Sequence, residues 1–150
     1  MLLTALYVAP PVLWMGVIFF LSAQPAATYQ AAVWATRGIP GVSYIVHGLL
    51  YFVLAFLIVR LLGRGNVRFL WLPAQLETYA AVAVVSSIMY GVSDEFHQKF
   101  VEGRAWSELD LLADLLGASA SAALWAGWRR WKSRLVLPDR RAPGAGQAEV

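Results

Sequence analysis

Apolar residues along the chain fall into four long runs separated by polar or turn-forming segments. The first run, residues 2–21, has no charge over 20 residues, and a helix of that length crosses the roughly 30 Å apolar layer of a bilayer. The second run covers residues 44–62 and carries Arg60 near its end, where a long side chain can reach the membrane surface. The third and fourth runs, residues 78–92 and 115–128, have only 15 and 14 uncharged residues. Since a span needs about 20 residues, the pattern predicts that polar residues beside these two runs also enter the membrane.

The composition agrees with a membrane protein, because 59% of the 150 residues are hydrophobic and only 14% are charged. No Lys or Arg precedes the first run, which favours a membrane span over a cleaved signal peptide. The chain has no cysteine, so disulfides and thiolate metal sites are excluded. We therefore expect an all-α integral membrane protein, a four-helix bundle formed by residues 1–128.

The distribution of Lys and Arg predicts the orientation of this bundle in the plasma membrane. Four spans put both termini on one side, together with the connection between the second and third spans. That side has nine basic residues and the other side has three, which places both termini in the cytoplasm by the positive-inside rule. Residues 129–150 are expected to form a basic, disordered tail suited to an anionic lipid surface, not to nucleic acid. The nine residues are Arg60, Arg64, Arg68, Arg129, Arg130, Lys132, Arg134, Arg140 and Arg141, and the three are Arg37, Lys99 and Arg104.

Acidic residues gather around the connection between the third and fourth runs. Six of the nine acidic residues fall within 21 positions there, and Lys99 and Arg104 offset only two of the six charges when both histidines are neutral. Charges at membrane depth are costly unless they are paired or functional. Either some of the carboxyl groups are protonated, or a cation completes a site. The six residues are Asp94, Glu95, Glu102, Glu108, Asp110 and Asp114.

Helical spacing brings the polar residues of this region onto shared faces. A third helix that continues past residue 92 carries Tyr90, Asp94, His97 and Gln98 on one face. Ser107 precedes Asp110 at the spacing of a capping box, so the fourth helix should begin at Ser107. That helix carries a second polar face, which ends in two small residues that permit close packing. We expect His47, at the outer end of the second helix, and Ser22 and Gln24, just past the first, to lie at the same level. The second face consists of Asp110, Asp114, Gly117 and Ser121.

The segment YGVSDEFHQKFVEGR at residues 90–104, followed by Asp110, Asp114 and Gly117, resembles the signature of the VanZ-like family. The segment FLSAQP at residues 20–25, and His47 with Tyr51, resemble earlier landmarks of that family. The chain departs from the family pattern at Glu102, Ser121 and Tyr44, where proline, glycine and lysine are frequent. The resemblance implies four spans and a role in the cell envelope linked to resistance against teicoplanin, a glycopeptide antibiotic. It implies no particular reaction.

The leading hypothesis is an outward-facing polar pocket that binds a lipid-linked or cell-wall precursor head group, with or without chemical modification of it. Asp94, Glu95 and His97 are the candidate acid/base residues. Arg104 is the candidate grip for an anionic group, because its planar fork matches phosphate or carboxylate; a salt bridge to Glu102 or Asp110 is the alternative. The other residues expected to line the pocket are Gln98, His47, Tyr90, Asp110, Asp114, Ser22 and Gln24.

Two other classes of function stay open. In the first, the protein is a non-catalytic membrane module that binds lipids or partner proteins, and the charges serve helix assembly. In the second, which ranks last, it is a proton-coupled transporter, although four short spans show no inverted repeat. A metal held by His47 and His97 is not favoured, because their spacing matches no dedicated metal motif. Cofactor use and oligomeric state do not follow from the sequence.

Overall fold

A computed structural model describes residues 2–28, 41–63 and 76–136, and the described residues are helical without any strand. The four long helices are α1 (Leu2–Ser22), α3 (Val42–Leu62), α4 (Leu76–Gln98) and α5 (Glu108–Val136). Residues 26–28 begin a further helical segment after α1. The expected all-helical class is confirmed.

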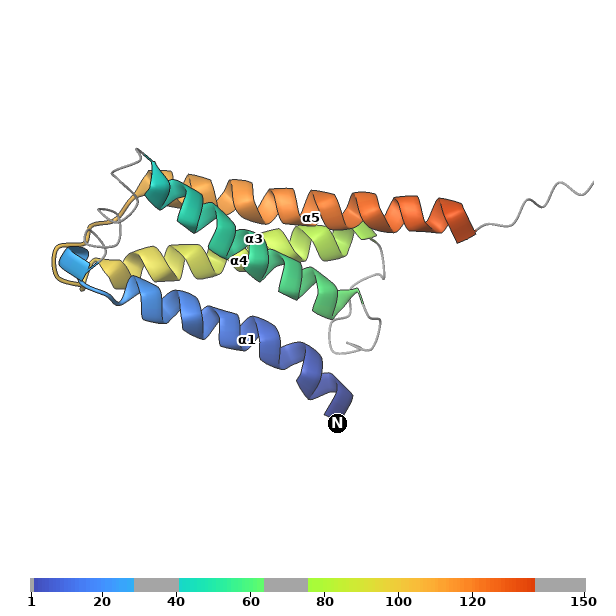
Figure 1. Ribbon diagram of the computed structural model, residues 1–150, viewed down its shortest axis with the longest axis horizontal. Coiled ribbons are helices and arrows are strands. Elements are labelled where there is room, and N and C mark those ends of the chain that lie inside the picture. The colour runs from blue at the N-terminus through green and yellow to red at the C-terminus, as the bar shows by residue number, and fades with distance from the viewer. Residues whose placement is uncertain (1, 29–40, 64–75, 137–150) are drawn as a thin grey trace, which may run out of the picture.

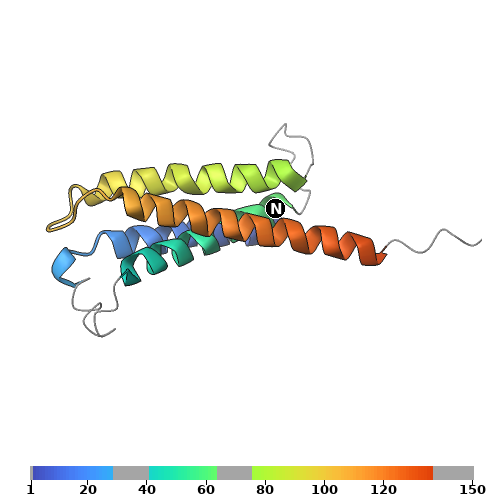
Figure 2. The ribbon, with the colours of Figure 1, turned by 90° about the horizontal axis from the view of Figure 1, so that it is seen from above.

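The four helices run alternately in opposite directions along the long axis of the molecule (Figure 1). The end of α1, the start of α3, the end of α4 and the start of α5 therefore gather at one end, whereas the start of α1 and the end of α5 lie towards the other. Helix α5 packs against α3 and α4, and α1 packs against the same two helices. Figure 2 shows α4 and α5 side by side from above.

The helices carry apolar side chains on the outside and many polar side chains inside. Leu13, Phe20, Met89 and Leu124 are 65% or more exposed, whereas Glu95 and Ser87 are fully buried. A soluble monomer rarely exposes so much contiguous apolar surface. Such an outer surface fits lipid, which requires polar groups to be satisfied inside the protein.

Three helices, α3, α4 and α5, are long and apolar enough to cross a membrane by length and composition, and the apolar segment Leu6–Ser22 of α1 is shorter. Two features expected from the sequence are confirmed. Helix α4 continues past residue 92 as far as Gln98, and α5 begins directly after Ser107. Residues 93–98 thus extend the helix of the third apolar run, and residues 108–114 belong to the helix of the fourth. The two apolar runs are too short to span a membrane without these polar extensions.

Helix α5 also continues beyond the expected boundary of the tail at residue 129. Residues 129–136 are helical rather than disordered. Neither glycine nor proline occurs between Gly127 and Pro138 to stop the helix, and Arg130 Nη2 lies 2.7 Å from Glu77 Oε1 on α4. Residues 137–150 lie outside the described residues, as do Arg37, Arg64, Arg68, Arg140 and Arg141 of the basic count.

The backbones of α3 and α5 come close together at Gly48 and Gly117. A Cβ atom on Gly117 would overlap the carbonyl oxygen of Gly48 and lie 2.9 Å from its Cα atom. Gly117 was expected to allow a close approach, and this is confirmed. Ser121, one turn further along α5, is also buried, so small residues form the contact stripe typical of membrane helices.

Replacing Gly117 with alanine should push α3 away from α5 and destabilise the protein by about 1–3 kcal/mol, as overpacking does. Gly127→Ala is the matched control on the same helix, since nothing lies within 4 Å of its added Cβ atom. Thermal unfolding followed by circular dichroism in detergent compares the two variants. Equal stability of both variants would contradict the close contact.

Candidate functional site

Buried polar side chains gather at the end of the molecule where α1 and α4 end and α3 and α5 begin (Figure 1). We call this set the polar cluster. All four long helices contribute to it, as the sequence predicted. Its members are Ser22, His47, Asp94, Glu95, Gln98, Asp110 and Asp114, each no more than 9% exposed.

Asp94 joins α4 to α1. Its Oδ1 atom accepts a hydrogen bond of 2.6 Å from the hydroxyl of Ser22, and its Oδ2 atom accepts one of 3.2 Å from Gln98 Nε2. One helical turn earlier, the hydroxyl of Tyr90 donates to the carbonyl of Met15 at 2.7 Å. The end of α1 is therefore held by polar bonds to two successive turns of α4.

Glu95 joins α4 to the start of α5. The side-chain oxygen of Ser107 accepts a hydrogen bond from the Asp110 backbone at 3.1 Å, so Ser107 caps the helix as predicted. In a capping box the acidic residue three positions on returns a bond to the backbone of the cap. Here Glu95 fills that role from the preceding helix, because its Oε2 atom accepts from the Ser107 backbone nitrogen at 2.9 Å. Because Glu95 makes this bond, the carboxylate of Asp110 does not cap the helix and instead faces α3.

His47 joins α3 to α5. Its Nδ1 atom lies 3.2 Å from Asp114 Oδ1, within hydrogen-bond distance, and its Nε2 atom lies 4.0 Å from Asp110 Oδ1. Ser43, one turn earlier on α3, donates to the same Asp110 oxygen at 3.4 Å. The predicted face of the fourth helix therefore meets α3, where His47 lies beside both aspartates. The predicted face of the third helix, with Asp94 and His97, contacts α1 instead.

Residues 23–28, which follow α1, and residues 99–107, which join α4 to α5, contact one another at this end of the molecule. The side chain of Arg104 donates from both Nε and Nη2 to Gln98 Oε1, the former at 3.1 Å. The backbone nitrogen of Ala26 donates to the carbonyl of Glu102 at 3.1 Å. Gly103 follows with φ of 73°, a left-handed conformation that glycine adopts without strain. The Gly-Arg pair of the motif thus turns the chain so that Arg104 reaches back to α4.

Two residues expected in the pocket lie apart from the bonded network. The His97 ring lies against Phe19 of α1, with 4.6 Å between ring centroids, and its buried Nε2 atom has no hydrogen-bond partner among the described residues. Gln24 Nε2 donates to the carbonyl of Phe20 in an exposed position. A helix turns by about 100° per residue, which directs His97 towards α1 and Glu95 towards α5.

Ser43 and Tyr51 are polar members of the site that the candidate set did not include. Both lie four residues from His47 on the same helix face, and this spacing is the signal that could have identified them. Tyr51 is fully buried, and its hydroxyl has no hydrogen-bond partner within the described part of the chain.

Three residues of the polar cluster are close enough together to share a metal ion. His47, Glu95 and Asp110 each offer a ligand atom, and these atoms lie within 4.8 Å of one another. The carboxylates come from α4 and α5 and the imidazole from α3. The grouping differs from the pair of histidines considered from the sequence, because His97 takes no part in it.

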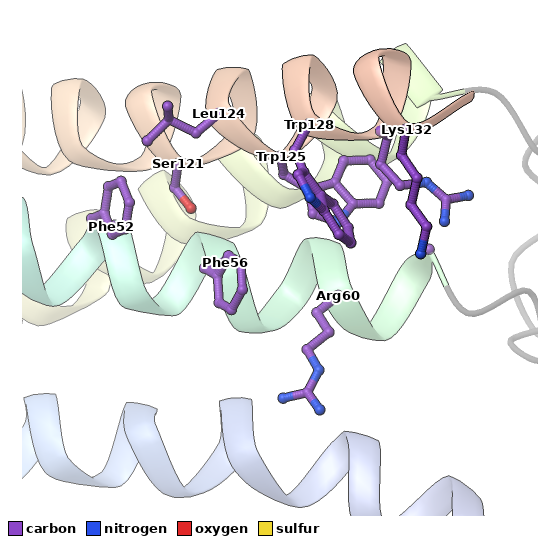
Figure 3. A pocket seen from close by; sticks show the side chains of 10 residues that line it. Phe52, Phe56, Arg60, Ser121, Leu124, Trp125, Trp128 and Lys132 are labelled. Carbon is purple, nitrogen blue, oxygen red and sulfur yellow. The ribbon is translucent and has the colours of Figure 1, made fainter. Parts of the chain in front are cut away.

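A cavity of about 760 Å³ lies at the other end of α3 and α5, between their diverging surfaces (Figure 3). Phe52, Phe56 and Leu124 give it an apolar wall, and Trp125 and Trp128 lie across it. The polar cluster does not line this cavity. Arg129 and Lys132 stand at its rim, with their charged groups 5.7 Å from the Trp125 ring and 5.4 Å from the Trp128 ring.

An apolar outer surface, membrane-length helices and a buried polar cluster define this chain as a helical membrane protein. The family model VanZ/LLP1 matches residues 7–129, so the chain belongs to the VanZ/LLP1 family, as its motif predicted. A search of curated proteins gave no match, and a search of solved structures gave none either.

The substitution Ser22→Ala removes a hydrogen-bond donor to the buried carboxyl group of Asp94. It should lower the free energy of unfolding by about 1–3 kcal/mol. Ser93→Ala is the control, since Ser93 is exposed and donates only to a carbonyl of its own helix. Unfolding of both variants in detergent measures the difference. In a double-mutant cycle with Asp94→Ala, which removes the acceptor, the coupling energy should be clearly different from zero; additive effects would argue against the Ser22–Asp94 bond.

Proposed function

We propose that this protein crosses the plasma membrane four times with both termini in the cytoplasm, and that its polar cluster faces outward to bind a lipid-linked or cell-wall precursor head group. Three helices of membrane length support the spans, and α1 supplies the fourth. The alternating helix directions place the polar cluster at the end opposite the start of α1. The excess of basic residues on the side of the termini supports the orientation.

The observation that carries the proposal is a hydrogen-bonded path from Arg104 through Gln98 to two buried carboxyl groups. Arg104 offers a planar cation suited to a phosphate or carboxylate group. Asp94 and Glu95 lie behind it and can accept or donate a proton once a ligand excludes water. A buried network of this size exceeds what helix packing requires, and ionisable groups at membrane depth mark function by default.

His97 is the third proposed acid/base group. Its buried, unpartnered Nε2 atom leaves one ring nitrogen available to a ligand that enters between α1 and α4. The resemblance to VanZ-like proteins implies a link to teicoplanin tolerance, and binding of a cell-wall precursor at this site would give such tolerance a physical basis.

Replacing Glu95 or His97 with alanine should abolish the glycopeptide tolerance conferred on a susceptible host, because each removes a group from the proposed site. Glu108→Gln, an exposed acid at the start of α5, is the matched control. Minimal inhibitory concentrations of teicoplanin provide the readout, with membrane abundance measured in parallel. Full tolerance in both alanine variants would count against the site, whereas lost abundance would favour a structural role for the charges.

A second candidate function, a membrane module that binds lipid, is favoured by the cavity between α3 and α5. Its apolar wall suits acyl chains, and Arg129 and Lys132 at its rim suit an anionic head group. Arg60 directs its guanidinium away from α5 towards α1 (Figure 3), where it lies 5.6 Å from the ring of Tyr7. The hydroxyl of Ser121 is a buried group without a hydrogen-bond partner among the described residues, and it lies on the cavity wall.

Replacing both Arg129 and Lys132 with glutamine should weaken the binding of phosphatidylglycerol by roughly fivefold for each charge removed, because each cation near an anionic lipid contributes about 1 kcal/mol. Arg130→Gln is the control, since Arg130 pairs with Glu77 and does not line the cavity. Native mass spectrometry of the protein in mixed lipid micelles counts bound phosphatidylglycerol against phosphatidylcholine. An unchanged ratio in the double variant would exclude the cavity as an anionic lipid site.

A further inference from the structure

We propose that His47, Glu95 and Asp110 bind one divalent transition-metal ion, with Asp114 holding the imidazole in position. The three ligand atoms already lie within 4.8 Å of one another. The nitrogen and oxygen ligands of one tetrahedral zinc ion lie about 3.4 Å apart, because each bond is about 2.1 Å long. Shifts of about 1.4 Å or less in the ligand atoms, produced by side-chain rotation, therefore complete the site, which does not depend on whether a head group binds.

The orientation of His47 is the first observation behind this assignment. A metal-binding histidine almost always gives its second ring nitrogen to a carboxylate, which fixes the ring and its tautomer. Nδ1 of His47 lies 3.2 Å from Asp114 Oδ1, and Nε2 lies 4.0 Å from Asp110 without a hydrogen bond to it. Asp114 thus holds the ring through Nδ1. The other nitrogen, Nε2, points towards Asp110 but lies too far from it for a hydrogen bond.

The two carboxylates are oriented in the same manner. Glu95 is held by the backbone nitrogen of Ser107 and by Gln98, and Asp110 is held by the hydroxyl of Ser43. Hydrogen bonds of this kind commonly fix the carboxylates that bind a metal. Each proposed ligand therefore comes from a different helix and has its own support.

Charge provides an independent argument. Asp94, Glu95, Asp110 and Asp114 are all buried, and within the described part of the chain the hydrogen-bond donors to the first three are serine, glutamine and backbone groups, which carry no charge. His47 lies beside Asp110 and Asp114. Several buried carboxylates without cations are costly in an apolar environment. A divalent ion between Glu95 and Asp110 offsets two of the four charges and accounts for why the sequence gathers them.

The ligand set indicates the type of metal. One imidazole nitrogen and two carboxylate oxygens suit Zn²⁺ or Mn²⁺, whereas Ca²⁺ and Mg²⁺ prefer oxygen ligands throughout. Three protein ligands leave at least one coordination position open, as in catalytic zinc sites. An anionic oxygen of a ligand could occupy that position.

The experiment uses the full-length protein in detergent, stripped with a chelator and then titrated with Zn²⁺ and, separately, with Mn²⁺. Isothermal titration calorimetry and elemental analysis after desalting should give one ion per chain for at least one metal. Asp110→Asn and Glu95→Gln should abolish this binding, and Asp114→Asn should weaken it by about 10–100-fold, as loss of an outer partner does. Glu108→Gln, an exposed acid two residues before Asp110, should bind like the wild type.

Wild-type protein that binds neither ion would overturn the assignment, as would Asp110→Asn and Glu108→Gln binding equally well. If the ligand variants do not fold, the wild-type titration alone decides, because fewer than one ion per chain rejects the site. His97→Ala separates this inference from the proposed function. It should retain the metal, since His97 faces α1, even where it loses antibiotic tolerance; metal loss in this variant would place the ion elsewhere.

Discussion

Four carboxyl groups, those of Asp94, Glu95, Asp110 and Asp114, are buried among helices whose outer surfaces are apolar. Because an unpaired polar group in such surroundings is costly, each must find partners inside the protein. The partners come from every neighbouring element: Ser22 at the end of α1, Ser43 and His47 at the start of α3, and the cap of α5. The need to satisfy these groups therefore fixes how the four helix ends meet.

Much of this arrangement could be predicted from the sequence. The short third and fourth apolar runs required polar helix extensions, the Ser107–Asp110 spacing located a cap, and the four-residue spacings on α5 identified its inner face. Other features depend on helix phase and loop path, which a single sequence does not determine. His97 belongs by spacing to the face of Asp94, yet that face meets α1. Glu95 is predicted to belong to the candidate site, but its role in capping α5 arises only when the Gly103 turn brings Ser107 back to α4. The continuation of α5 to Val136 differs from the predicted disordered tail, because a basic composition alone does not distinguish a helix from disordered chain.

The contact between Gly48 and Gly117 explains why one helix pair supports two different sites. Helices that touch at one point separate on both sides of it. On the side towards the start of α5, the space is filled by His47 and the aspartates. On the other side, Phe56 and Trp125 belong to the wall of the apolar cavity (Figure 3). The polar cluster and the apolar cavity thus lie at opposite ends of the same interface.

The hydrogen bond between Glu95 and the backbone of Ser107 joins residues only 12 positions apart. It links the end of α4 to the start of α5, so these two helices form a helical hairpin held together at its tip. Contacts between residues close in sequence form early during folding. If the bond between Glu95 and Ser107 forms before or during insertion into the bilayer, the carboxylate of Glu95 enters the membrane with a hydrogen-bond donor already in place. The translocation machinery would then handle the two helices as one unit, and the short third run would not have to insert by its own hydrophobicity.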